Sequence, residues 1–181
     1  LDTLIYRSGR TSLKSYNPTS VEYCYWSPFL DINNISEKKY KYSCWIYSDG
    51  PSAEVFFFMK PNTENNYYGT GWQIDPINRK TTQIGKWVYI EGEVMVPLNM
   101  EQIYLRVDNN GGGTVWFDDL RLYPSDAQMK TYTYIPFIGL TSETDEKNTT
   151  IFYEYDSTGR LRCVKDNDGN ILKHYDYNYR H

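Results

Sequence analysis

Apolar and polar residues alternate along most of the chain with a period of two, which is typical of β-strands that bury one face. In the segment 39–47 the even-numbered residues are predicted to face the core, whereas in 101–107 the odd-numbered residues are predicted to do so. The pattern extends over most of the first two thirds of the sequence. We predict strands over residues 11–16, 21–26, 39–47, 53–60, 87–96, 101–107 and 114–123.

Turn-forming residues separate these segments. Asp49-Gly50-Pro51 ends one strand, and the run 109–113 (Asn-Asn-Gly-Gly-Gly) needs the positive φ angles that asparagine and glycine tolerate. The segment 53–60 is apolar on nearly both faces, which predicts a central strand covered on both sides. No stripe with the 3.6-residue period of a helix is present. Short strands at regular spacing therefore predict an all-β fold, either a sandwich or a barrel.

Composition agrees with strands and excludes several classes of function. Aromatic residues make up 17% of the 181 residues, and 19 of them are tyrosines, which fit half-buried pleated surfaces. The formal net charge is −4 and lysine and arginine form no block, so the basic patch of a nucleic-acid-binding protein is missing. The apolar runs are too short to span a bilayer, so we expect no membrane span.

A different pattern begins after a Pro-Ser-Asp-Ala linker at residues 124–127. Tyr-x-Tyr motifs then recur at intervals of 21 and 22 residues, starting at Tyr132, Tyr153 and Tyr175. Each unit predicts a strand, a turn rich in aspartate and glycine, and a second strand. We therefore predict a β-sandwich domain over residues 1–124 and a tail of β-hairpin repeats over residues 125–181.

The run 153–161 (YEYDSTGRL) contains Tyr-x-Tyr-Asp, two residues and then Gly-Arg-Leu, and Gly169 closes the next turn. This signature closely resembles the Rhs/YD-repeat family. In that family long arrays build a β-shell on large secreted or surface proteins of bacteria, but the units here are too few to close a shell. The first unit departs from the pattern, because Tyr134 is followed by Ile135 and no arginine precedes Leu140.

Four stretches of the first domain also match a known family: Ser8–Leu13 (SGRTSL), the strand 41–47, Gly85-Lys-Trp87 and 116–120 (WFDDL). Together they resemble the jelly-roll carbohydrate-binding modules of the family 4/9/22 type. The resemblance implies a jelly-roll-like β-sandwich, a glycan ligand and a structural calcium ion between the first and last strands. The opening strand of such modules, with its Asn and Glu, is cut short in this sequence.

Asp118 and Asp119 form the most prominent acidic pair. Adjacent strand residues point to opposite faces, so these two carboxylates cannot flank one glycosidic bond. Parity groups Asp118 with Leu120 and Leu122 on the core side, where a carboxylate needs a partner. Two interpretations stay open for Asp118: a calcium ligand, which the resemblance also implies, and a hydrogen-bonded acid at the edge of the sandwich.

Glu91 and Glu93 share one face of their strand, but nothing near them in the sequence supplies the cleft of a glycosidase. We predict that both are solvated, and we predict no catalytic residues. Cys24 and Cys44 lie on separate strands, so they form either a disulfide between neighbouring strands or two small buried hydrophobic residues.

Strand parity places Trp45, Tyr47, Tyr104 and Arg106 on outward faces. Sugars bind flat aromatic rings through their C–H surfaces and planar donors such as arginine through their hydroxyls, so these four are the predicted carbohydrate-binding residues. The alternative is that they pack against the tail or another domain, because tyrosine-rich hairpins with little core of their own need a partner surface. Trp26, Phe56 and Phe58 carry the same two interpretations.

The sequence therefore predicts a non-catalytic carbohydrate-binding or adhesion module at the C-terminal end of a large secreted or cell-surface protein. Its partners would be a glycan and upstream domains of the parent protein. The alternative is a structural cap that ends an Rhs-like repeat array and has no ligand of its own. The chain starts at Leu1, as expected for a fragment of a longer protein, and its last unit stops without another turn, which favours His181 as the natural end.

Overall fold

The computed structural model describes residues 1–17, 19, 22–32, 36–50, 53–61 and 84–178. The predicted all-β class is confirmed, because every pair of strands in this part of the chain is antiparallel and no helix occurs in it. The described residues form two compact units: unit 1 contains Leu1–Arg7 and Thr11–Ala127, and unit 2 contains Ser8–Arg10 and Gln128–His181. The division at Ala127 lies slightly beyond the predicted boundary at residue 124.

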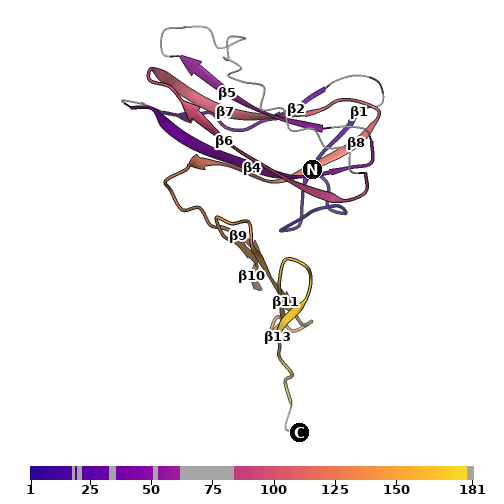
Figure 1. Ribbon diagram of the computed structural model, residues 1–181. Coiled ribbons are helices and arrows are strands. Elements are labelled where there is room, and N and C mark those ends of the chain that lie inside the picture. The colour runs from indigo at the N-terminus through magenta and orange to yellow at the C-terminus, as the bar shows by residue number, and fades with distance from the viewer. Residues whose placement is uncertain (18, 20–21, 33–35, 51–52, 62–83, 179–181) are drawn as a thin grey trace. The chain divides into compact units, whose positions relative to one another are not determined.

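Unit 1 is a sandwich of two sheets (Figure 1). The first sheet has the strand order β1-β8-β4-β6. Its long central strands β4 and β8 pair from Tyr40 and Pro124 at one end to Ser48 and Val115 at the other. The strands of this sheet are β1 (Leu13–Asn17), β4 (Lys38–Ser48), β6 (Trp87–Val96) and β8 (Gly113–Pro124).

The second sheet is arranged around β7 (Met100–Asn109). On one side β7 pairs with β2 (Glu22–Trp26) and β3 (Leu30–Asp31), and on the other it pairs with β5 (Ala53–Pro61). Among the described strands β5 pairs only with β7, so the prediction that 53–60 is a central strand stays a prediction. Its outward phenylalanines pack beside residues of β7, which accounts for apolar side chains on both faces.

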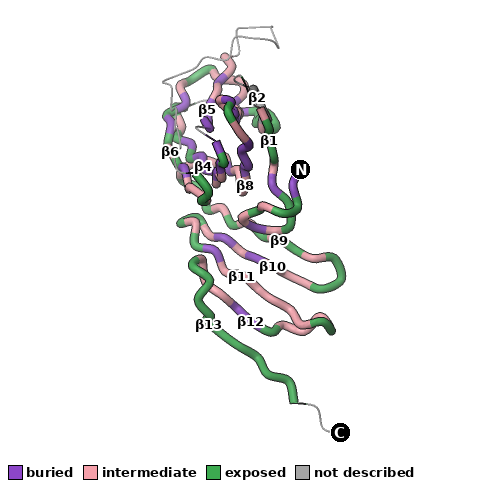
Figure 2. The backbone as a smooth tube through the Cα atoms, turned by 90° about the vertical axis from the view of Figure 1, so that its right-hand side faces the viewer, coloured by how far each residue is buried: buried purple, intermediate pink, exposed green. Residues whose placement is uncertain are grey.

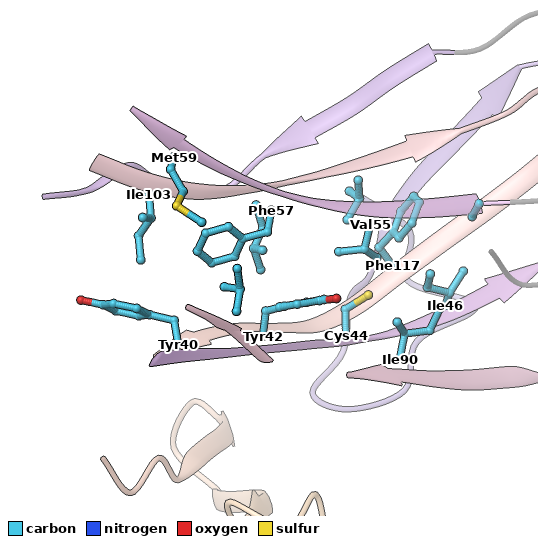
Figure 3. Packing of buried hydrophobic residues seen from close by; sticks show 14 of the residues in the cluster. Tyr40, Tyr42, Cys44, Ile46, Val55, Phe57, Met59, Ile90, Ile103 and Phe117 are labelled. Carbon is cyan, nitrogen blue, oxygen red and sulfur yellow. The ribbon is translucent and has the colours of Figure 1, made fainter. Parts of the chain in front are cut away.

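Side chains from the two sheets interlock to form the core (Figure 3). Strand β4 contributes the predicted alternate residues from Tyr40 to Ile46, all of them at most 4% exposed. Strand β5 faces them with Val55, Phe57 and Met59, of which Phe57 has its ring 6.2 Å from that of Tyr42. Outward residues of the same strands alternate with these, as the period of two predicts.

The ring of Tyr42 passes directly over Gly92, its register partner on β6, where a Cβ atom would overlap the phenol. Replacing Gly92 with alanine should therefore lower the free energy of unfolding by about 1–3 kcal/mol, the usual cost of overpacking. Urea denaturation monitored by tryptophan fluorescence measures the change. Alanine at Gly85, which has nothing within 4 Å of an added Cβ but has a φ of 73°, controls for backbone strain alone.

The glycine-rich turn between β7 and β8 has the predicted geometry. Gly111 and Gly112 have φ angles of 86° and 87°, which side chains with a Cβ rarely adopt. The buried side chain of Asn109 holds the turn together, because its Oδ1 accepts a hydrogen bond from the amide of Gly111 and its Nδ2 donates to the carbonyl of Gly113. The turn thus joins the central strands of the two sheets.

Unit 2 is a five-stranded meander in which each strand pairs with the next in sequence. Figure 2 shows the last strand exposed along its length, whereas buried residues gather in the strands before it. The buried side chains include Cys163 and the small polar residues Ser142, Thr144 and Thr150. The strands are β9 (Thr131–Ile135), β10 (Gly139–Thr144), β11 (Thr150–Tyr155), β12 (Leu161–Lys165) and β13 (Ile171–His174).

An aspartate closes each of the last hairpin turns of unit 2 in the same way. The Oδ1 of Asp156 accepts hydrogen bonds from the amides of Thr158 and Arg160, and the Oδ1 of Asp166 accepts from the amides two and four residues further on. Asp145 makes the same pair of bonds. The hydroxyl of Thr158, followed by the backbone amide of Arg160, holds the pKa of the Asp156 carboxyl well below its usual range.

The second tyrosine of the Tyr-x-Tyr motif binds the backbone of the preceding repeat. Tyr155 donates its hydroxyl to the carbonyl of Leu140 at 2.8 Å, and Tyr177 donates to the carbonyl of Leu161 at 2.7 Å. The guanidinium of Arg160 lies 4.3 Å from the centre of the Tyr177 ring. The repeat noticed in the sequence is therefore also a repeat of contacts.

Within the described part of the chain there is no helix long and apolar enough to cross a membrane.

Candidate functional site: two aromatic faces of the sandwich

The predicted sugar-binding residues all point away from the core, but the structure does not bring them together. Trp45 and Tyr47 lie on β4 in the first sheet, whereas Tyr104 and Arg106 lie on β7 in the second. The four residues therefore do not form one surface, because the two strands belong to different layers and their outward faces point in opposite directions. Each pair instead belongs to a separate aromatic surface.

The first surface, which we call the Tyr104 face, covers the outer side of the second sheet. Register pairs Phe58 with Tyr104 and Phe56 with Arg106 across β5 and β7. The rings of Phe58 and Tyr104 are stacked, with centroids 5.0 Å apart and planes 6° from parallel. Phe29, in the segment before β3, meets Tyr104 edge to face at 4.9 Å. The Tyr104 face consists of Phe29, Phe56, Phe58, Tyr104 and Arg106.

Arg106 continues this row of planar groups. Its guanidinium carbon lies 4.8 Å from the ring centres of both Phe56 and Phe58, close enough for cation–π attraction. Its Nε and Nη2 donate to the same oxygen, Oδ2, of Asp108 at 3.1 and 2.9 Å. The side chain of Arg106 is 17% exposed. The face thus combines apolar rings with a fixed cationic donor.

Asp108 is almost completely buried beneath this row. Burial raises its pKa to about 6, Arg106 acts in the opposite direction, and the nearby carboxylate of Glu54 raises it further. Glu54 is its register partner on β5 and is only 6% exposed. Neither acid reaches the surface, so neither can act on a glycosidic oxygen of a bound sugar.

The second surface, which we call the Trp45 face, covers the outer side of the first sheet. Register places Trp45 opposite Tyr89 and Tyr47 opposite Trp87, and their ring centroids are 5.1 and 5.6 Å apart. Trp116, the partner of Tyr47 on β8, completes the group at 5.4 Å. The Trp45 face consists of Trp45, Tyr47, Trp87, Tyr89 and Trp116.

Cations from the N-terminal segment lie over two rings of the Trp45 face. The guanidinium carbon of Arg7 is 4.6 Å from the Trp45 ring centre, and the Nζ of Lys14 is 5.3 Å from that of Trp116. Trp116 itself is only 5% exposed. These rings therefore already have partners within unit 1.

The predicted inward orientation of Asp118 is wrong. The pairing of β4 with β8 shifts between Ser43 and Trp45, and Asp119 has a positive φ of 50° at this β-bulge. The extra residue reverses the parity, so Asp118 is the register partner of Trp45, whereas Leu120 packs against the core.

The carboxylate of Asp118 accepts hydrogen bonds from backbone amides. Its Oδ2 accepts a hydrogen bond from the amide of Arg7 at 2.7 Å, and its Oδ1 accepts from the amide of Asp119 at 2.8 Å. No cluster of at least three His, Cys, Asp or Glu able to hold a metal ion occurs among the described residues. Neither observation tests for bound calcium, so calcium at Asp118 stays a prediction. Asp118 also lines a cavity of about 280 Å³ together with Thr11, Leu13, Tyr25, Val107 and Phe117.

The remaining candidates behave as surface or core residues. Glu91 and Glu93 are exposed, as predicted, and Glu93 forms an ion pair of 2.9 Å with Lys39. Cys44 is a free thiol in the core and is therefore not bridged to Cys24. Burial raises the pKa of the Cys44 thiol far above its ordinary value, as expected for an unreactive cysteine.

Sequence reasoning missed Phe29, Glu54 and Asp108, all of which belong to or support the Tyr104 face. Strand alternation places Asp108 on the same side as Arg106. The predicted strand ended at residue 107, directly before Asp108 and the glycine-rich turn, so Asp108 was not counted as a strand residue. Nothing in the sequence marks Phe29, which lies between strands. Trp26 is the register partner of Arg106 on β2, but its side chain lies outside the described residues.

Comparison with known proteins gives structural neighbours only. No family model matches the chain, and no curated protein matches it. One similar structure is "Family 16 Carbohydrate Binding Module-2", with 13% identity, a TM-score of 0.43 and coverage of 64% of this chain and 78% of that chain.

Two further neighbours carry xylan-related names. The CBM22-1 xylan-binding domain of Paenibacillus barcinonensis Xyn10C has 13% identity, a TM-score of 0.45 and coverage of 70% of this chain and 80% of that one. The CBM22-1-GH10 modules of Clostridium thermocellum xylanase 10B, complexed with xylohexaose, have 14% identity and a TM-score of 0.42, and the match covers 70% of this chain and 25% of that chain.

Proposed function

We propose that this chain is a non-catalytic carbohydrate-binding or adhesion module that binds a glycan at the Tyr104 face. We place it at the C-terminal end of a large secreted or cell-surface bacterial protein of the Rhs type, with unit 2 as its repeat-like tail. The observation that supports binding is the row of planar side chains on the outer side of the second sheet. It joins apolar rings, a guanidinium and a buried carboxylate within a few residues of one another.

This combination suits a sugar. The C–H surfaces of a pyranose pack on aromatic rings, while its hydroxyls accept hydrogen bonds from planar donors. Phe29, at one end of the row, is 38% exposed and leaves apolar surface open to solvent. The Trp45 face is the weaker candidate, because Arg7 lies over Trp45 and Lys14 over Trp116, and Trp116 is itself buried.

The test is a glycan array probed with the full chain and followed by titration of the strongest hits, with xylohexaose included. Tyr104→Ala should weaken the affinity at least about tenfold, as expected for an aromatic residue at the centre of a binding surface. Trp45→Ala is the matched control on the opposite layer and should leave the affinity unchanged. Loss of binding in Trp45→Ala alone would move the site to the Trp45 face.

Calcium is tested in the same experiment. The array is run with calcium and again with a chelator, and Asp118→Asn is included as a variant. From the hydrogen bonds of Asp118 we expect binding to be unaffected by chelation. Calcium-dependent binding that Asp118→Asn abolishes would instead support the prediction that Asp118 is a calcium ligand.

A structural cap without a ligand is the second candidate function. The contacts that favour it are the bonds from Tyr155 and Tyr177 to the backbone of the preceding repeat, which make unit 2 a self-sufficient end to a repeat array. A blank array, with circular dichroism showing a folded chain, would support the cap and contradict glycan binding.

A further inference from the structure

Asp108 is the feature of the Tyr104 face that glycan stacking does not explain. It is 1% exposed and uses only Oδ2 to bind Arg106. Its other oxygen, Oδ1, has no hydrogen-bond partner in the described part of the chain. A carboxylate buried with an unused oxygen lowers stability, so its presence is not accounted for by folding.

Burial and a neighbouring carboxylate disfavour the negative charge of Asp108, whereas Arg106 favours it. Across β5 it faces Glu54, and like charges directly opposite one another in a sheet repel. On its own strand the nearest charge is Arg106, and across β2 its register partner is Tyr23. Burial is the largest cause of the raised pKa of Asp108, about 6, and Arg106 is the counter-charge that keeps it ionised at neutral pH.

We propose that Asp108 is a positioning residue of the glycan site: its ionised carboxylate holds the guanidinium of Arg106 between Phe56 and Phe58, and protonation of Asp108 releases Arg106 and weakens glycan binding. This inference rests on the proposed function. The proton adds to Oδ1, the oxygen that Arg106 does not use. The neutral acid keeps Oδ2 as an acceptor but has lost its charge, so its hydrogen bonds to the guanidinium become weaker and no longer fix the plane of Arg106.

The proposal predicts that binding and stability respond to acid in opposite directions. Because the folded pKa of Asp108 lies above its ordinary value, its contribution to stability increases as the pH falls from about 6 towards 4. Binding decreases over the same range, since fewer molecules have Arg106 in place. At pH 5 about one molecule in ten keeps Asp108 ionised, so the apparent Kd should be about tenfold higher than at pH 7.5.

The first experiment needs no glycan. NMR follows the side-chain Nε–H of Arg106 from pH 7.5 to pH 4.5 in the full chain. We expect its chemical shift to change with a midpoint near pH 6 in the wild type and to stay constant in Asp108→Asn, which is neutral at every pH. A resonance that does not titrate in the wild type overturns the inference.

The second experiment measures binding of xylohexaose by calorimetry at pH 7.5 and pH 5. Asp108→Asn should bind weakly at both values and lose the roughly tenfold pH effect, a result that a purely structural role would not give. Glu91→Gln, an exposed acid on the other sheet, is the matched control and should keep the full effect. Circular dichroism at pH 5 checks that the sandwich stays folded.

The two hypotheses fail in different ways. Binding that is equally strong at both pH values overturns the role of Asp108 and leaves the proposed function intact. No binding of xylohexaose at either pH, together with a blank glycan array, overturns the proposed function; an Arg106 resonance that still follows Asp108 then supports only the coupling between the two residues.

Discussion

Replacing Phe57 with alanine should destabilise unit 1 by about 3–5 kcal/mol, the usual cost of removing a buried phenylalanine. Phe57 is 2% exposed and lies between the two sheets, where its ring meets that of Tyr42. The truncation removes the apolar area and leaves a cavity that neighbouring strands cannot close, because they are fixed by their pairing. Urea denaturation of the full chain measures the change in the free energy of unfolding.

Phe58 is the matched control, because it is the same residue type one position along β5 and points to the other side. Its ring contacts Tyr104 and Arg106 rather than the core, so Phe58→Ala should cost about 1–2 kcal/mol, less than a fully buried ring. Phe58→Ala should also weaken glycan binding. Equal losses of stability in the two variants would contradict the inward and outward assignment of β5.

Replacing Arg106 with alanine should cost about 2–4 kcal/mol at pH 7.5, because it leaves the buried carboxylate of Asp108 without its counter-charge. Its removal raises the pKa of Asp108 further above the ordinary value. The native state then binds a proton more tightly than the unfolded state, so stability falls as the pH rises through this range. The loss should therefore be largest at pH 7.5 and much smaller at pH 5, which thermal unfolding at the two pH values measures.

The double variant Arg106→Ala/Asp108→Asn separates charge from packing. If the uncompensated charge causes the loss, the second substitution should restore most of the stability at pH 7.5. A double variant as unstable as Arg106→Ala would instead assign the loss to the packing of the guanidinium between the phenylalanines. Together with the two single variants, the double variant measures the coupling energy between Arg106 and Asp108.

Strand positions and the direction of most side chains could be predicted from the sequence, because alternation is a local property. The inward residues of β4, β6 and β7 follow the period of two without exception, and the sheet-joining turn follows from its glycines. The tail was recognisable as hairpins because its tyrosines and turn residues recur. The turn at Asp145 escaped notice only because Asn148, with a φ of 60°, takes the place of glycine.

The candidate site was harder to predict, because it depends on which strands share a sheet. The alternating pattern predicts correctly that Trp45 and Tyr104 both point away from the core. Only the long-range pairing of β4 with β8 and of β5 with β7 shows that they lie on different sheets and so on separate faces. Asp118 shows a second limit, since a single extra residue in β8 places it on the opposite face from Leu120, with which it would share a face in a regular strand. A contact such as Phe29 with Tyr104 joins a loop to a strand far away in the sequence and leaves no local pattern.

The meander of unit 2 has a mechanical consequence. Because each strand pairs only with its neighbours in sequence, a pulling force on the C-terminus loads the backbone hydrogen bonds of β13 one after another rather than all together. The hairpins should therefore peel away singly at low force, with each tyrosine-to-carbonyl bond marking one step. Such a segment extends gradually under tension and dissipates work in steps rather than in one rupture.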